Sequence, residues 1–178
     1  MDSSRHTGRP VQIERVRGRL DENTRAGLRA FWKSQDVLEG GQAEVRLPRV
    51  LSRLIDEAGR TVGSSSATAA RIPAIGNQWL QVYRCLIAPD FDTPERWMQM
   101  LATGWDILSE ASERTAEPHC IGVLVPVADP AILKAWPQAI WPETRFLHAG
   151  VARNGAALRL RYFEDARIDT EAGHERGR

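Results

Sequence analysis

The sequence predicts a single domain of the α/β class, in which a mixed sheet carries helices on both faces. An apolar segment at residues 79–88, a long amphipathic segment and a second apolar segment at 120–127 follow one another in the order strand, helix, strand. Turn signals also divide residues 49–72 and 144–168 into two hairpins. Parallel strands joined through a helix, together with antiparallel hairpins, indicate a mixed sheet.

The composition is that of an ordinary globular domain. Of the 178 residues, 42% are hydrophobic and 26% charged, which is enough for a sizeable core. The 24 basic and 23 acidic residues give a formal charge of +1, which predicts no nucleic-acid and no membrane partner. All basic residues except Lys33 and Lys134 are arginine, which we interpret as the codon bias of a GC-rich bacterial genome.

Polar ends at 1–10 and 169–178 predict disordered tails around a domain at 11–168. The sequence contains no apolar run of the roughly 18–20 residues that a membrane helix needs, and its first ten residues lack an apolar signal core. We therefore expect a cytoplasmic protein. Cys85 and Cys120 are isolated and the histidines are scattered, which predicts no metal site.

The first half of the domain begins with a short strand near 11–18, followed by a helix at 23–34 with Leu28, Phe31 and Trp32 at helical spacing. Gly40, Gly41 and Gln42 are predicted to form a loose joint.

Residues 44–58 fit both a helical stripe and a buried strand. The turn signature at 56–59 favours a hairpin of residues 49–56 with residues 60–72.

The second half centres on residues 79–88, which are nearly all apolar, as in a strand covered on both faces. Thr93 and Pro94 then start a helix that we expect to reach about Arg114. One face of this helix is predicted to pack on the sheet through Trp97, Leu101, Trp105 and Leu108.

A further strand at 119–127, a short helix from 129 to about 136 and a terminal hairpin complete the domain. The arms of that hairpin are 144–151 and 157–168, joined through Asn154 and Gly155.

This order of elements resembles the GNAT-type N-acyltransferase fold over about 150 residues. Local phrases add to the resemblance: DEAGRTVG at 56–63 is similar to the family's acidic-Gly hairpin, and CLIAP at 85–89 to the end of its fourth strand. The resemblance implies an acyl-CoA donor such as acetyl-CoA and a small-molecule or peptide amine as acceptor.

The chain departs from the family at the pyrophosphate motif, Arg/Gln-x-x-Gly-x-Gly/Ala. Asp92, Glu95 and Trp97 stand where the family has its Arg, its first Gly and its last Gly or Ala. Carboxylates and a helix cap at this position disfavour phosphate. The alternative is therefore a non-catalytic GNAT-like binding or interaction module that has lost coenzyme A binding.

The resemblance also implies cofactor-binding positions. The main chain of Leu86, Ile87 and Ala88 would pair with the pantetheine arm, in a slot where the fourth and fifth strands diverge. Arg96 is the nearest candidate to hold the pyrophosphate. Trp136 stands near the family's usual acid, a tyrosine, so that Tyr83 or Tyr162 would have to replace it.

Three residues are candidates for catalysis. Arg84 interrupts an apolar strand, so it needs a buried carboxylate or a ligand anion; the alternative is a position near a sheet surface with pairing to Asp90, Asp92 or another acid. Tyr83 is either a proton donor or a core residue with a bonded hydroxyl. His119, at a loop edge, is either a base or a surface histidine.

Arg159 and Arg161 share a face of the last strand. They would either bind an acidic ligand or form a solvated hairpin face.

Overall fold

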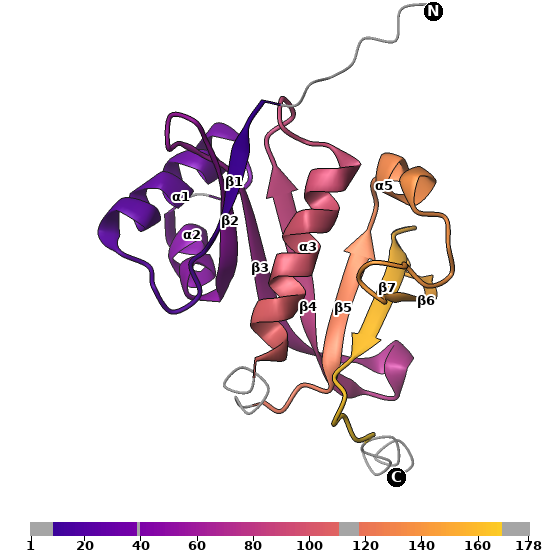
Figure 1. The fold of residues 1–178 in the computed structure, drawn as a ribbon. Coiled ribbons are helices and arrows are strands. Elements are labelled where there is room, and N and C mark those ends of the chain that lie inside the picture. Colours follow the sequence, from indigo (N-terminus) through magenta and orange to yellow (C-terminus); the bar gives the residue numbers. More distant parts are fainter. Residues whose placement is uncertain (1–8, 39, 111–117, 169–178) are drawn as a thin grey trace, which may run out of the picture.

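The computed structural model describes residues 9–38, 40–110 and 118–168 of the chain. Most of both predicted tails and the last part of the predicted long helix lie outside these residues. The described residues form a seven-stranded sheet in the order β1-β2-β3-β4-β5-β7-β6 (Figure 1). Its strands are β1 (Val11–Arg15), β2 (Val50–Asp56), β3 (Thr61–Ile72), β4 (Gln78–Ile87), β5 (Gly122–Val127), β6 (Leu147–Val151) and β7 (Ala157–Tyr162).

Four described helices accompany the sheet: α1 (Glu22–Ser34), α2 (Gly40–Arg46), α3 (Pro94–Ser109) and α5 (Pro130–Ala135). Within the described ranges, no helix is both long and apolar enough to cross a bilayer. Figure 1 shows α3 lying across the middle of the sheet, with α1 and α2 gathered beside β1 and β2.

The predicted strand–helix–strand unit is confirmed, because β4 and β5 are parallel neighbours joined through α3. Every other pair of neighbouring strands is antiparallel, so the sheet is mixed as expected. The hairpin of β2 and β3 resolves the ambiguity at 44–58 in favour of a strand from Val50.

One local expectation is wrong. The segment predicted to be a loose joint begins α2, and a single 3-10 turn at Leu47–Arg49 connects α2 to β2. Ala43 and Leu47 are buried in the same cluster as Leu28 and Trp32 of α1, and this packing stabilises a helix that two glycines disfavour.

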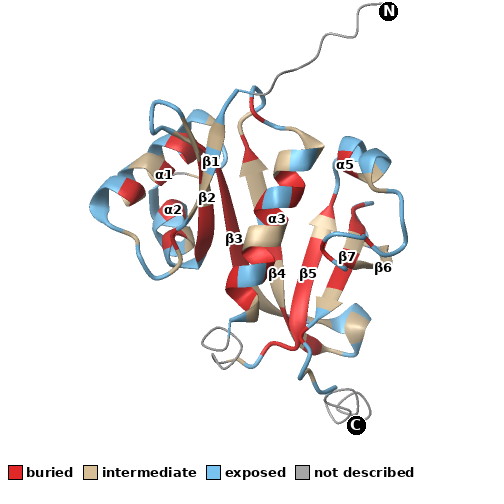
Figure 2. Ribbon diagram, viewed as in Figure 1, coloured by how far each residue is buried: buried red, intermediate tan, exposed pale blue. Residues whose placement is uncertain are grey.

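The helix α3 packs as its sequence pattern predicts. Thr93 is the N-cap residue, and its side chain accepts a hydrogen bond from the main-chain N–H of Arg96. The four predicted apolar side chains, from Trp97 to Leu108, are all buried. Figure 2 shows this buried stripe alternating with exposed residues along the helix.

The solvated face predicted for the last strand is wrong. Arg159 is 4% exposed, donates to the main-chain oxygens of Gln138 and Ala139 and covers the ring of Trp141. Arg161 lies 3.8 Å from the ring centroid of Trp105. Cation–π contacts with the aromatic core, which alternation along a strand does not reveal, therefore hold these side chains.

Candidate functional site

The central strands β4 and β5 open a gap in the sheet. They pair only at Gln81 with Val123 and at Val82 with Leu124, although β4 continues to Ile87 and β5 to Val127. The carboxyl-terminal halves of the two strands therefore diverge.

The main-chain N–H and C=O groups of β4 point alternately toward β3 and toward β5 along the strand. The N–H of Ala88 donates to the main-chain oxygen of Val62 in β3, while the C=O of Trp79 accepts from the N–H of Ile121 on the β5 side. Because the pairing of β3 with β4 is continuous in register, the main-chain groups of Cys85 and Ile87 are directed toward β5, beyond the last paired residues.

The three expected main-chain positions thus divide into two groups. Ile87 presents its N–H and C=O to the gap, whereas those of Leu86 and the N–H of Ala88 point toward β3. The C=O of Ala88 accepts from the N–H of Phe91 in the turn that follows β4. Cys85 joins Ile87 on the gap side.

A pocket of about 320 Å³ lies at the gap, and its lining includes residues of α1, α2 and α3. We call the part lined by Tyr83, Cys85, Trp97 and residues 125–126 the inner part. The other lining residues, which we call the outer part, are Trp32, Val37, Leu38, Arg46, Ser64, Ser66, Arg84 and Leu86.

Tyr83 is the most deeply buried polar side chain of the inner part. Its ring contacts α3, and a Cβ added at Gly104 would lie 2.5 Å from its Cε2 atom. Burial raises the pKa of the hydroxyl well above the usual value of a tyrosine, with a smaller contribution from Cys85. The hydroxyl is near Ser65 and Cys85 but makes no hydrogen bond of ordinary geometry, so the expectation of a bonded hydroxyl is wrong.

Cys85 is a neutral thiol. Burial raises its pKa to about 12, and the carboxylate of Asp92 adds to that shift. A thiol of this kind is a poor nucleophile at neutral pH.

Arg84 is exposed, because its side chain leaves β4 on the face opposite to Tyr83, toward α1 and α2. The proposed pairing with Asp90 or Asp92 is wrong: among the described residues no carboxylate lies within ion-pair distance of Arg84, and Asp90 pairs with Arg9. Its exposure at the pocket explains why an arginine is tolerated in this central strand.

Arg46, at the end of α2, extends into the same outer part of the pocket. It donates to the Ser66 hydroxyl at 3.2 Å, and Ser66 lies directly across from Arg84 in the pairing of β3 with β4. Burial lowers the pKa of Arg46, and the charges of Arg84 and Arg49 lower it further.

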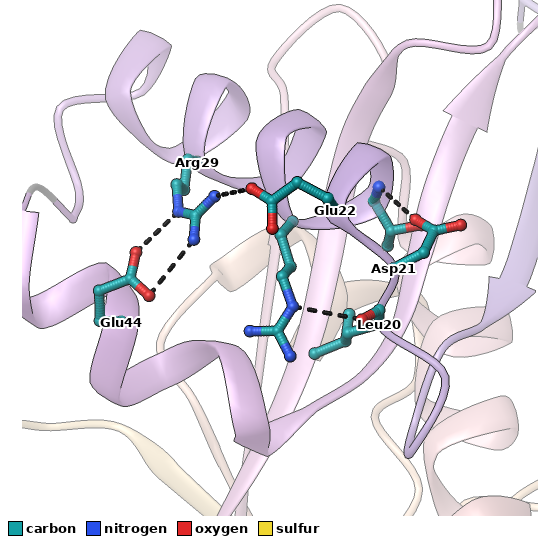
Figure 3. Close-up of polar contacts among 7 residues, drawn as sticks. Leu20, Asp21, Glu22, Arg29 and Glu44 are labelled. Atoms are coloured by element: carbon teal, nitrogen blue, oxygen red, sulfur yellow. Dashed lines mark hydrogen bonds and ion pairs between the residues drawn. The ribbon is translucent and has the colours of Figure 1, made fainter.

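An ion pair joins α2, which ends in Arg46, to α1. The guanidinium of Arg29 in α1 donates to Glu44 of α2 at 2.7 Å, and it also donates to Glu22 of its own helix at 2.9 Å (Figure 3). Asp21 caps the start of α1 by accepting from the N–H of Thr24. Helix α1 in turn places Trp32, whose indole N–H donates to Ser64 in the pocket.

The start of α3 is acidic. Partial burial raises the pKa of Asp92, and the nearby carboxylate of Asp129 raises it further. Arg96 donates to the main-chain oxygens of Phe91 and Arg9, so its guanidinium braces the start of the helix.

The remaining candidates lie away from the pocket. His119 is exposed and precedes β5 at the end opposite to the gap. Tyr162 is 37% exposed and ends β7. In the part of the chain that the structure describes, no group of histidine, cysteine or acidic residues is arranged to hold a metal ion.

Sequence reasoning missed Arg46, Ser64, Ser66 and Trp32. Nothing local marks Arg46, because its partners are distant in sequence. The alternation of Ser64 and Ser66 in β3 was a usable signal, since it places two hydroxyls on one face of a strand.

Neither a scan against protein-family models nor a search of curated proteins gives a match to this sequence. Solved structures do match. One is a bacterial toxin, with TM-score 0.58 and 15% identity over 88% of this chain and 92% of that one. A second is a GNAT-family acetyltransferase from Streptococcus pneumoniae, with TM-score 0.55 and 9% identity over 86% and 99% of the two chains.

A third is NAA60 from Arabidopsis thaliana in complex with acetyl-CoA, with TM-score 0.50, 8% identity and coverage of 86% and 100%. At sequence identities this low, the structural matches establish the fold alone. The divergent parallel strands and the structural matches lead to one conclusion: the chain has the GNAT acyltransferase fold.

Proposed function

We propose that the protein is an N-acyltransferase that moves an acyl group from a coenzyme A thioester to an amine. The observation that carries the proposal is the gap between β4 and β5, beside which a pocket lies. Main-chain groups directed into such a gap can pair with an extended chain of amides, as pantetheine is. Cys85 and Ile87 supply these groups here.

Tyr83 is the residue to which we assign proton transfer. It lines the inner pocket, and its raised pKa keeps it protonated at neutral pH. When the amine nitrogen bonds to the thioester carbonyl carbon and the C–S bond breaks, the hydroxyl would give its proton to the departing sulfur. The proton that the nitrogen loses would then restore the tyrosine through solvent, so that charge and protons balance.

The test is transfer from acetyl-CoA to a panel of amines, followed by thiol release and by the mass of the acylated product. We expect Tyr83→Phe to lower kcat roughly 100-fold or more, which is the contribution of a general acid. The variant removes an unpartnered hydroxyl without changing the ring, so its melting temperature should not fall.

Tyr162→Phe is the matched control, because Tyr162 is the second of the two tyrosines and lies outside the pocket. Unchanged kcat in Tyr83→Phe would refute the assignment of Tyr83. Failure of the wild-type protein to acylate any amine would refute the transferase.

The start of α3 supports a second candidate, a GNAT-like binding module without coenzyme A. Thr93 already caps this helix end, and two neighbouring carboxylates, Asp92 and Asp129, would repel a pyrophosphate. Thermal unfolding with acetyl-CoA separates the candidates. A ligand at 100 times its Kd adds about 2.7 kcal/mol to the unfolding free energy, whereas the binding module would show no shift.

A further inference from the structure

We propose that the outer pocket binds the anionic group of the acceptor, so that the amine acylated by this protein carries a carboxylate or a phosphate. The proposal rests on the transferase function proposed above. The two arginines that would hold the anion are Arg46 and Arg84.

Arg46 and Arg84 both line the pocket, and their charges are close enough to interact. Arg46 donates to the hydroxyl of Ser66, and Arg84 is the residue of β4 that pairs with Ser66. Both side chains line the same pocket of about 320 Å³. Two positive charges that share a partly buried volume repel each other, and a bound anion removes that repulsion.

No protein group neutralises this pair within the described part of the chain. Among the described residues that line the pocket there is no aspartate and no glutamate, and neither arginine forms an ion pair with a described residue. Arg29, Arg53 and Arg60, by contrast, each have a carboxylate partner. Paired guanidinium groups suit planar carboxylates and phosphates because they offer several donors in a fixed geometry.

The rest of the lining fits the body of such an acceptor. Trp32, Leu38 and Leu86 offer apolar walls, and the Ser66 hydroxyl offers a further polar contact beside the arginines. The inner end of the same pocket reaches Tyr83. An acceptor held by its anion at Arg46 and Arg84 would therefore direct its amine inward, toward the gap between β4 and β5.

The coenzyme is the other source of an anion. Helix α3 begins at the position expected for the pyrophosphate. It packs on the face of the sheet from which the side chain of Tyr83 extends. Arg84 leaves β4 on the opposite face, toward Trp32 of α1. Because Arg84 and the start of α3 lie on opposite faces of the sheet, we assign the bound anion to the acceptor and not to the coenzyme.

The experiment compares matched amines by calorimetry without coenzyme. β-Alanine is paired with its neutral amide, and O-phosphoethanolamine with ethanolamine. We expect each anionic amine to bind roughly 10-fold or more tightly than its neutral partner, which corresponds to one charge-assisted contact. Arg46→Gln and Arg84→Gln should each bring the two affinities close together.

Arg153→Gln, in the turn between β6 and β7, is the control with the same loss of charge and should retain the preference. Arg84→Gln replaces an exposed side chain that has no ion-pair partner among the described residues, so it should fold even if Arg46→Gln does not. Equal affinities for matched amines in the wild-type protein would overturn the proposal. A preference that survives in Arg84→Gln would also overturn it.

Two further measurements separate the possible failures. If Arg84→Gln weakens coenzyme A binding as much as it weakens β-alanine binding, the arginines hold the coenzyme and the acceptor assignment is wrong. If anionic amines bind through both arginines but acetyl-CoA is never consumed, the anion pocket stands and the transferase is refuted. If transfer occurs equally to neutral amines and in both arginine variants, the transferase stands and the acceptor class is wrong.

Discussion

Gly104 shows how one residue without a side chain shapes the candidate site. It lies inside α3, yet the ring of Tyr83 occupies the space where a Cβ would be, with 2.5 Å to Cε2. The cost of a glycine within a helix is therefore balanced by close packing of the helix on β4.

We expect Gly104→Ala to lower the free energy of unfolding by about 1–2 kcal/mol, because overpacking outweighs the gain in helix propensity. Gly41→Ala in α2 is the control, since nothing lies within 4 Å of its added Cβ. That variant should be neutral or stabilise by up to about 1 kcal/mol. Denaturant midpoints measure both, and equal stabilisation by the two substitutions would contradict the close contact.

Asp92 gives a pH-dependent prediction. Its folded-state pKa is raised above the ordinary 3.8, so the folded protein binds more protons than the unfolded chain between those two values. The free energy of unfolding therefore rises as the pH falls through this window. Asp92→Asn removes this dependence, so any stabilisation that it gives at pH 7 should shrink in acid. Melting curves across pH test this, and a difference that grows in acid would contradict it.

At the scale of elements, Trp105 packs α3 against the residues that flank β6 and β7. Trp105 packs edge-on to Phe146, with ring centroids 5.8 Å apart, and contacts Phe163 at 5.4 Å. Trp105→Ala should cost about 3–5 kcal/mol of unfolding free energy. The control is Trp79→Ala, because Trp79 is only partly buried and should cost less. Melting of Trp105→Ala within a degree of wild type would contradict the packing.

The two carboxylates near the start of α3 lead to a prediction about the coenzyme. Asp92→Asn together with Asp129→Asn removes their repulsion, and asparagine retains the N-cap that Asp129 provides for α5. We expect the double variant to bind coenzyme A roughly 5–10-fold more tightly. Calorimetry measures this, and an unchanged Kd would show that the carboxylates do not face the phosphates.

At the scale of the whole molecule, one sheet joins both halves of the chain. Strand pairing is continuous from β1 to β6, with the shortest ladder between β4 and β5. We expect a single unfolding transition, because α3 packs across this short ladder. Far-ultraviolet circular dichroism and tryptophan fluorescence should give coincident curves. Separate transitions would mean that the two halves unfold independently at the gap.

Much of the fold follows from the sequence because its signals are local. The stripe from Trp97 to Leu108 predicts a helix that packs on a sheet, and the apolar segment at 79–88 predicts a central strand. The order strand, helix, strand then leads to parallel neighbours through the right-handed crossover. Periodicity could not predict α2, since Ala43 alone of its residues is buried, and it packs in the cluster that includes α1.

The candidate site depends on contacts between distant residues, which tertiary structure decides. The sequence by itself singled out Tyr83 and Arg84 and the missing phosphate motif, because residue types and spacing are visible there. It could not show that Arg46 reaches Ser66, twenty positions away, or that Arg84 has no carboxylate partner among the described residues. Whether a charged side chain meets an acid, a second arginine or solvent depends on the packing of helices on a sheet, so only the folded chain determines the charge of its pocket.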